Sequence, residues 1–133
     1  MIAMRILVVD DNDRVRRGVM GLLSSQQGWE VCGEASDGAD GLQQARDLLP
    51  DLVIIDISMP GVGGLEAARL MSQELPGTKI LIMSQHDPSQ VLQGALAAGA
   101  HGCVDKSRLG FDLLPAIKAI GAEHSFSARV AGR

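Results

Sequence analysis

Aromatic residues are scarce in this chain, whose 133 residues include no tyrosine, one tryptophan and two phenylalanines. The core must therefore be built from Leu, Ile, Val, Ala and Met, and a stacking platform for single-stranded nucleic acid is not expected. The net charge of -4 argues against non-specific DNA binding by this segment, because such binding needs a basic face.

Long apolar runs and paired cysteines are also missing. No run approaches the ~20 residues of a membrane span, and residues 1–5 lack the apolar region of a signal peptide. The two cysteines, Cys32 and Cys103, show neither metal-binding nor CxxC spacing. These absences favour a cytoplasmic protein with no membrane contact. The length of 133 residues is enough for one domain with a buried core.

The chain does contain short apolar runs, each followed by a polar residue. Residues 6–9, 52–55 and 80–83 are typical of strands buried on both faces. Residues 29–34 alternate like a half-exposed edge strand, and residues 102–104 predict a short fifth strand. Helical patterns lie between these runs. Asp13 and Asp87 are predicted to cap two of the helices, and the last helix is expected from about Asp112 to Ile120.

Five strands alternating with five helices predict an α/β fold with a doubly wound, five-stranded parallel sheet. The order 2-1-3-4-5, which is flavodoxin-like, places the half-exposed strand at an edge. Residues 1–121 are expected to form this domain, and residues 122–133 a C-terminal tail or the start of a linker. In such sheets the functional site lies beyond the carboxyl ends of the strands.

Polar residues follow four of the five predicted strands: Asp10, Asp11, Asp56, Ser84 and Lys106. Carboxylates gathered at one edge repel one another unless a cation lies between them, and an all-oxygen ligand set favours Mg²⁺ or Mn²⁺. A metal, an ammonium group and a hydroxyl together suit a phosphoryl group. Asp56 is then the candidate nucleophile, which would form an aspartyl-phosphate. Taken alone, the acidic run, Ser84 and Lys106 are more typical of a helix cap, a strand end and a surface lysine, and Asp56 is as typical of a cap as of a site. Only the combination indicates a site.

Residues 4 to about 122 resemble the receiver domain of two-component response regulators. The matching motifs are Val8-Val9-Asp10-Asp11, the run from Ile54 to Pro60 with Gly64, Met83-Ser84, and Gly99-Ala100-His101-Gly102 leading to Lys106. The resemblance implies that Asp56 accepts phosphate from the phosphohistidine of a histidine kinase. It also implies that Asp11 binds Mg²⁺ directly, that Asp10 acts mainly through a coordinated water, and that the backbone carbonyl of Ser58 completes the metal site. Ser84 and Lys106 would hold the phosphoryl oxygens.

The resemblance extends to the output of the switch. Phosphorylation would draw Ser84 inward and repack the face formed by the fourth helix, fifth strand and fifth helix. Residues 102–107 and the following helix are similar to regulators with a C-terminal helix-turn-helix domain, which these 133 residues do not contain. DNA contact and control of transcription are therefore expected only through such a domain, and a homodimer is compatible with the family.

Two residues depart from the family pattern. Cys103 stands where Tyr or Phe is usual, so the aromatic form of the switch, which would couple phosphorylation to output, cannot operate. Ser107 replaces the proline that commonly follows the lysine. Neither departure touches the phosphoryl chemistry, and the chain is interpreted as a signalling domain that catalyses its own phosphorylation and dephosphorylation.

Three alternatives stay open at this point. The run Asp11-Asn12-Asp13-Arg14-Val15 fits the opening of haloacid-dehalogenase-like phosphatases, with Asp11 as nucleophile, but only Asp112 follows the lysine as a further acid. A flavodoxin-like FMN carrier is disfavoured because the acidic loop would repel a phosphate. A pseudo-receiver would keep the fold as an interaction module without being phosphorylated.

Overall fold

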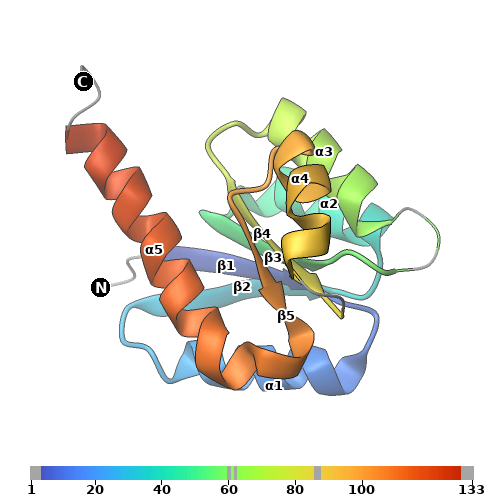
Figure 1. The fold of residues 1–133 in the computed structure, drawn as a ribbon, viewed down its shortest axis with the longest axis horizontal. Coiled ribbons are helices and arrows are strands. Elements are labelled where there is room, and N and C mark those ends of the chain that lie inside the picture. Colours follow the sequence, from blue (N-terminus) through green and yellow to red (C-terminus); the bar gives the residue numbers. More distant parts are fainter. Residues whose placement is uncertain (1–3, 60, 62, 86–87, 130–133) are drawn as a thin grey trace.

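The computed structural model describes residues 4–59, 61, 63–85 and 88–129. Its parallel strands form one sheet (Figure 1), consisting of β1 (Met4–Val9), β2 (Trp29–Ala35), β3 (Leu52–Asp56), β4 (Lys79–Ser84) and β5 (Gly102–Asp105). The order β2-β1-β3-β4-β5 confirms the predicted topology, with the half-exposed strand β2 at one edge.

Helices cover both faces of the sheet (Figure 1). α1 (Asp13–Ser24) and α5 (Leu109–Arg129) pack on one face, and α2 (Gly38–Leu48), α3 (Gly64–Glu74) and α4 (Pro88–Ala97) pack on the other. In the described part of the chain, no helix is both long and apolar enough to cross a bilayer.

Alternate residues of the central strands supply two separate cores, because successive side chains of a strand point to opposite faces. Val9 and Ile55 face the layer of α2, α3 and α4, whereas Val8 and Ile54 face the layer of α1 and α5. The central strands are thus held from both sides, and the polar residues at their carboxyl ends are held with them.

The first helix begins differently from the prediction. The N-cap of α1 is Asn12, whose side chain accepts the N–H of Val15 at 3.1 Å, and Asp13 is already helical. A carboxylate in the first turn is favourable because it faces the positive end of the helix dipole. Asp13 therefore contributes through charge rather than as the predicted cap. The cap predicted at Asp87 lies outside the described residues.

The last helix is also longer than predicted. Asp105 Oδ1 accepts the N–H of Ser107 at 2.8 Å, which starts a 3₁₀ turn (η1, Lys106–Arg108) that runs directly into α5 at Leu109 rather than near Asp112. Pro115 lies inside α5 at an exposed position. The carbonyl four residues earlier loses its helical partner there, but at the surface water can replace it.

Gly121 does not end α5, which continues to Arg129. A glycine terminates a helix by adopting positive φ, and Gly121 is not among the glycines that do so. The predicted end of the helix at Ile120 is therefore wrong, since the helix continues to Arg129. The domain boundary at residue 121, and the assignment of residues 122–133 to a tail or linker, remain predictions.

Candidate functional site

The carboxyl edge of the sheet brings together residues that are far apart in the sequence. Asp10 follows the last residue of β1, Asp56 ends β3 and Ser84 ends β4. Lys106 follows β5 and opens η1. Because β3 pairs with β4 so that Asp56 lies opposite Met83, Ser84 lies one residue beyond the phosphoacceptor candidate on the neighbouring strand.

Lys106 forms an ion-pair contact with two carboxylates. Its Nζ lies 2.9 Å from Asp10 Oδ2 and 3.3 Å from Asp56 Oδ2. The three side chains are 7%, 0% and 2% exposed, so the contact is made almost entirely out of water. Charges in such surroundings are costly unless they are paired, and removal of one partner leaves the others uncompensated.

The third carboxylate of the cluster belongs to Asp11, which is exposed. Asp10, Asp11 and Asp56 each offer one oxygen, and these oxygens lie within 4.8 Å of one another. Three negative charges against the single positive charge of Lys106 leave a deficit of two positive charges, which a divalent cation would fill.

Backbone N–H groups hold one oxygen of each buried carboxylate. The N–H of Asn12 donates to Asp10 Oδ1 at 2.8 Å, and that of Ser58 donates to Asp56 Oδ1 at 3.1 Å. The remaining oxygen, Oδ2, points toward Lys106 in both cases. Asp10 Oδ2 is buried, and among the described residues its contact is the ion pair with Lys106 at 2.9 Å. Because that one ammonium group is shared with Asp56 Oδ2, the site has room for a further cation to offset the buried charge.

Burial shifts the titration of this cluster. Desolvation raises the pKa of Asp10, and the Asn12 N–H and Lys106 only partly offset this effect. Burial acts to lower the pKa of Lys106, but its contact with Asp10 and the charges of Asp10 and Asp56 reverse the effect, and the pKa lies above its ordinary value. Lys106 is therefore charged at neutral pH, and Asp10 is a carboxyl group that gains from an added cation.

Arg16 on α1 supports the acidic loop, although no sequence motif singled it out. Its guanidinium donates to the backbone oxygen of Asp10 at 2.7 Å and pairs with Glu34 and Asp13 at 2.7 and 2.5 Å. Arg16 thus ties the end of β1 to α1 and β2. Its position three residues after the acidic Asp13 was a signal for that local pair, but the contact with Asp10 depends on the tertiary fold.

Gly64 supports the loop after β3 in another way. A Cβ atom at this position would lie only 1.9 Å from the carbonyl oxygen of Asp56, so α3 can begin here only with glycine. This close approach sets the path of the loop that carries Ser58.

The other predicted site residues have less defined roles. The Ser58 N–H contacts Asp56, whereas its carbonyl as a metal ligand stays a prediction. Ser84 is fully buried at the end of β4. Cys103 is half-buried on β5, where its side chain packs against the core shared with α2, α3 and α4. Its part in a switch stays a prediction.

Asp112, the acid that a phosphatase would need, instead pairs with Arg108 at 3.2 Å on the surface of α5.

Comparison with known proteins agrees with this geometry. The model of the response regulator receiver domain family matches residues 6–118. The chain is 37% identical over 118 residues to the response regulator GacA of Pseudomonas viridiflava, covering 89% of this chain and 55% of that protein. It is 33% identical over 130 residues to the transcriptional regulatory protein LiaR of Bacillus subtilis, covering 97% of this chain and 62% of that protein.

A solved structure gives the same result. The two-component response regulator of the LuxR family from Aurantimonas sp. SI85-9A1 superposes with a TM-score of 0.85 at 38% identity, covering 90% of this chain and 86% of that one. The chain spans little more than half the length of the curated relatives it matches. Those relatives are named as a response regulator and a transcriptional regulatory protein. The chain belongs to the response regulator receiver domain family of two-component systems.

Proposed function

We propose that this chain is a phosphorylation-dependent switch in which Asp56 accepts a phosphoryl group from the phosphohistidine of a histidine kinase. The observation that carries the proposal is the buried contact of Lys106 with Asp10 and Asp56, beside the exposed carboxylate of Asp11. An Asp56 carboxylate oxygen would form the new P–O bond while the P–N bond of the donor breaks.

The surrounding residues fit this transfer. Asp10, Asp11, Asp56 and the backbone carbonyl of Ser58 would hold Mg²⁺, or Mn²⁺ in its place. When bound, the cation offsets the charge of the phosphoryl oxygens and of the acidic cluster. Lys106, whose raised pKa keeps it charged, would pair with one phosphoryl oxygen, and the Ser84 hydroxyl would donate to another. The hydrogen bond from the Ser58 N–H holds Asp56 Oδ1 in a fixed orientation.

The names of the relatives support a proposal for the output of the switch. Some of these are named as transcriptional regulators and extend well beyond the matched region. We infer that phosphorylation alters the face of α4, β5 and α5 and controls transcription through a DNA-binding output domain, acting in the cytoplasm as a monomer or homodimer. Ser84 and Cys103 would belong to the moving part, with a small thiol in place of the usual aromatic ring.

Phosphorylation with acetyl phosphate and Mg²⁺, followed by mass mapping of the modified peptide, tests the proposal. The expected result is a single phosphorylated site at Asp56 that is lost in Asp56→Asn and on chelation of the metal. A modified Asp11 would support a phosphatase mechanism instead. A folded protein that neither accepts phosphate nor binds beryllofluoride in the presence of Mg²⁺ would be a pseudo-receiver.

A further inference from the structure

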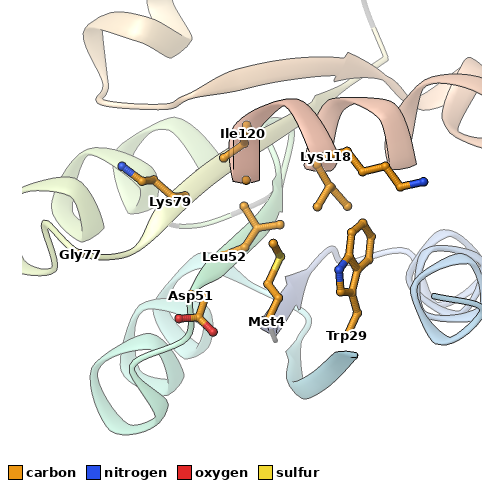
Figure 2. Close-up of a pocket in the computed structure, with 10 residues that line it drawn as sticks. Met4, Trp29, Asp51, Leu52, Gly77, Lys79, Lys118 and Ile120 are labelled. Atoms are coloured by element: carbon orange, nitrogen blue, oxygen red, sulfur yellow. The ribbon is translucent and has the colours of Figure 1, made fainter. Parts of the chain in front are cut away.

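The amino end of the sheet, opposite the acidic cluster, contains a cavity of about 460 Å³. It lies between the start of β1, β2 and β3 and the later turns of α5, and Figure 2 shows the residues around it. Its apolar lining is formed by Met4, Trp29, Leu52, Ile117 and Ile120. A volume of this size lies within the range of small-molecule sites in proteins.

Trp29 gives the cavity a polar group. Its indole nitrogen faces the side on which Met4 and Leu52 lie (Figure 2), and this N–H has no hydrogen-bond partner among the residues that the structure describes. Among the described residues, Trp29 is not one whose polar atom is buried without a partner, so this N–H reaches solvent and can donate to an oxygen acceptor. A ligand that brings an oxygen acceptor into this apolar space would supply one.

The charges at the rim favour a negative ligand. Lys79 and Lys118 stand on opposite sides of the cavity, with their ammonium groups directed outward (Figure 2), and neither pairs with a described carboxylate. The acidic residue of the lining, Asp51, is held in place because its Oδ2 accepts the backbone N–H of Arg5 at 2.8 Å. The lining therefore carries two positive charges without a described partner against the one negative charge of Asp51.

We propose that this cavity binds a small amphipathic organic anion, a carboxylate with an apolar chain of medium length. The chain would lie against the half-buried side chains of Met4 and Trp29, beneath which Leu52, Ile117 and Ile120 are buried. The carboxylate would lie at the rim within reach of Lys79 and Lys118. Long lysine side chains can turn toward such a group while their aliphatic portions stay packed. The proposal does not rest on phosphorylation, since Leu52 and Asp56 lie at opposite ends of β3, about 13 Å apart at 3.3 Å per residue.

Trp29 is the only tryptophan of the chain, and no tyrosine is present, so intrinsic fluorescence reports on this cavity alone. The experiment is a titration of the whole chain with octanoate, followed by tryptophan fluorescence and by calorimetry. Octylamine and octanol, which have the same chain but a positive and a neutral head group, are titrated in parallel. Saturable binding of octanoate is expected, with weaker binding of octanol and none of octylamine.

Variants sharpen the test. Lys79→Gln and Lys118→Gln should each weaken octanoate binding about two- to fivefold, the range of an exposed ion pair. Gly121→Leu should abolish binding by filling the cavity, since a Cβ there meets Met4 only at ordinary contact distance; circular dichroism checks that this variant is folded. Asp56→Asn should bind like the wild type. Absence of saturable binding, equal binding of all three probes, or unchanged octanoate affinity in both lysine variants and in Gly121→Leu would overturn the proposal.

Discussion

At the scale of single residues, Lys106 compensates two buried carboxylates at once. Its removal would leave Asp10 and Asp56 buried beside each other without a counter-charge. In metal-free buffer at neutral pH, Lys106→Ala should therefore lower the free energy of unfolding by about 3–5 kcal/mol. Urea denaturation in the presence of a chelator measures this loss.

The free energy of unfolding of Lys106→Ala should depend strongly on pH. The pKa of Asp10 is raised in the folded protein, so the folded state binds this proton more tightly than the unfolded state, and stability falls as pH rises through the folded pKa. Without the positive charge of Lys106 the fall should be larger, so the difference from wild type should widen from acid to neutral pH. Arg17→Ala, at an exposed position of α1, should change stability by less than about 0.5 kcal/mol. If Lys106→Ala lowers the free energy of unfolding by the same amount at acid and at neutral pH, this account is contradicted.

At the scale of elements, the connection from β3 to α3 is sensitive to a single methyl group. A Cβ at Gly64 would overlap the carbonyl of Asp56, so Gly64→Ala must displace either the end of β3 or the first turn of α3. Displacement of a reacting group by about 1 Å can cost about a hundredfold in rate. We expect phosphorylation by acetyl phosphate to slow by about ten- to a hundredfold at a temperature at which circular dichroism shows a folded variant.

Gly63→Ala is the matched control, one residue earlier in the same loop. Its backbone φ is −70°, which any residue adopts, and a Cβ there would meet nothing within 4 Å. This variant should be phosphorylated at nearly the wild-type rate. If the two variants slow the reaction equally, the contact between Gly64 and Asp56 does not position the phosphoacceptor.

The elements also show how far sequence patterns reach. The buried strands and their order were predictable because short apolar runs such as 52–55 alternate with helical patterns, which is typical of a parallel sheet. The polar residue after each run then placed Asp10, Asp56 and Lys106 at one edge. The start of α1 was not predictable, because the neighbouring residues Asn12 and Asp13 are both good N-caps and only the backbone geometry selects between them. The contact of Arg16 with Asp10 depends on packing between α1 and β1, which no local pattern encodes.

At the scale of the whole molecule, metal binding should stabilise the fold. Mg²⁺ would bind the folded cluster but not the dispersed carboxylates of the unfolded chain. Above its dissociation constant, each tenfold rise in Mg²⁺ should therefore add about 1.4 kcal/mol to the free energy of unfolding. Thermal denaturation across a Mg²⁺ series should show the midpoint rising by a few degrees per step.

Replacement of one carboxylate of the cluster provides the comparison. Asp11→Asn, which is exposed and costs little stability on its own, should remove most of the Mg²⁺ dependence. Asp47→Asn, an exposed carboxylate on α2 outside the cluster, should keep it. A midpoint that responds to Mg²⁺ equally in all three proteins would indicate a general salt effect.

The two cores also determine which positions of this sequence can change during evolution. The residues that hold the reactive edge in place are inside, on the central strands, where almost any substitution costs stability. Substitutions on the outer faces of the helices cost less stability. Positions such as Gly18 and Gly21 on α1 have open space around them. New partner specificities can therefore arise by surface mutation in duplicated copies while the chemistry is inherited unchanged.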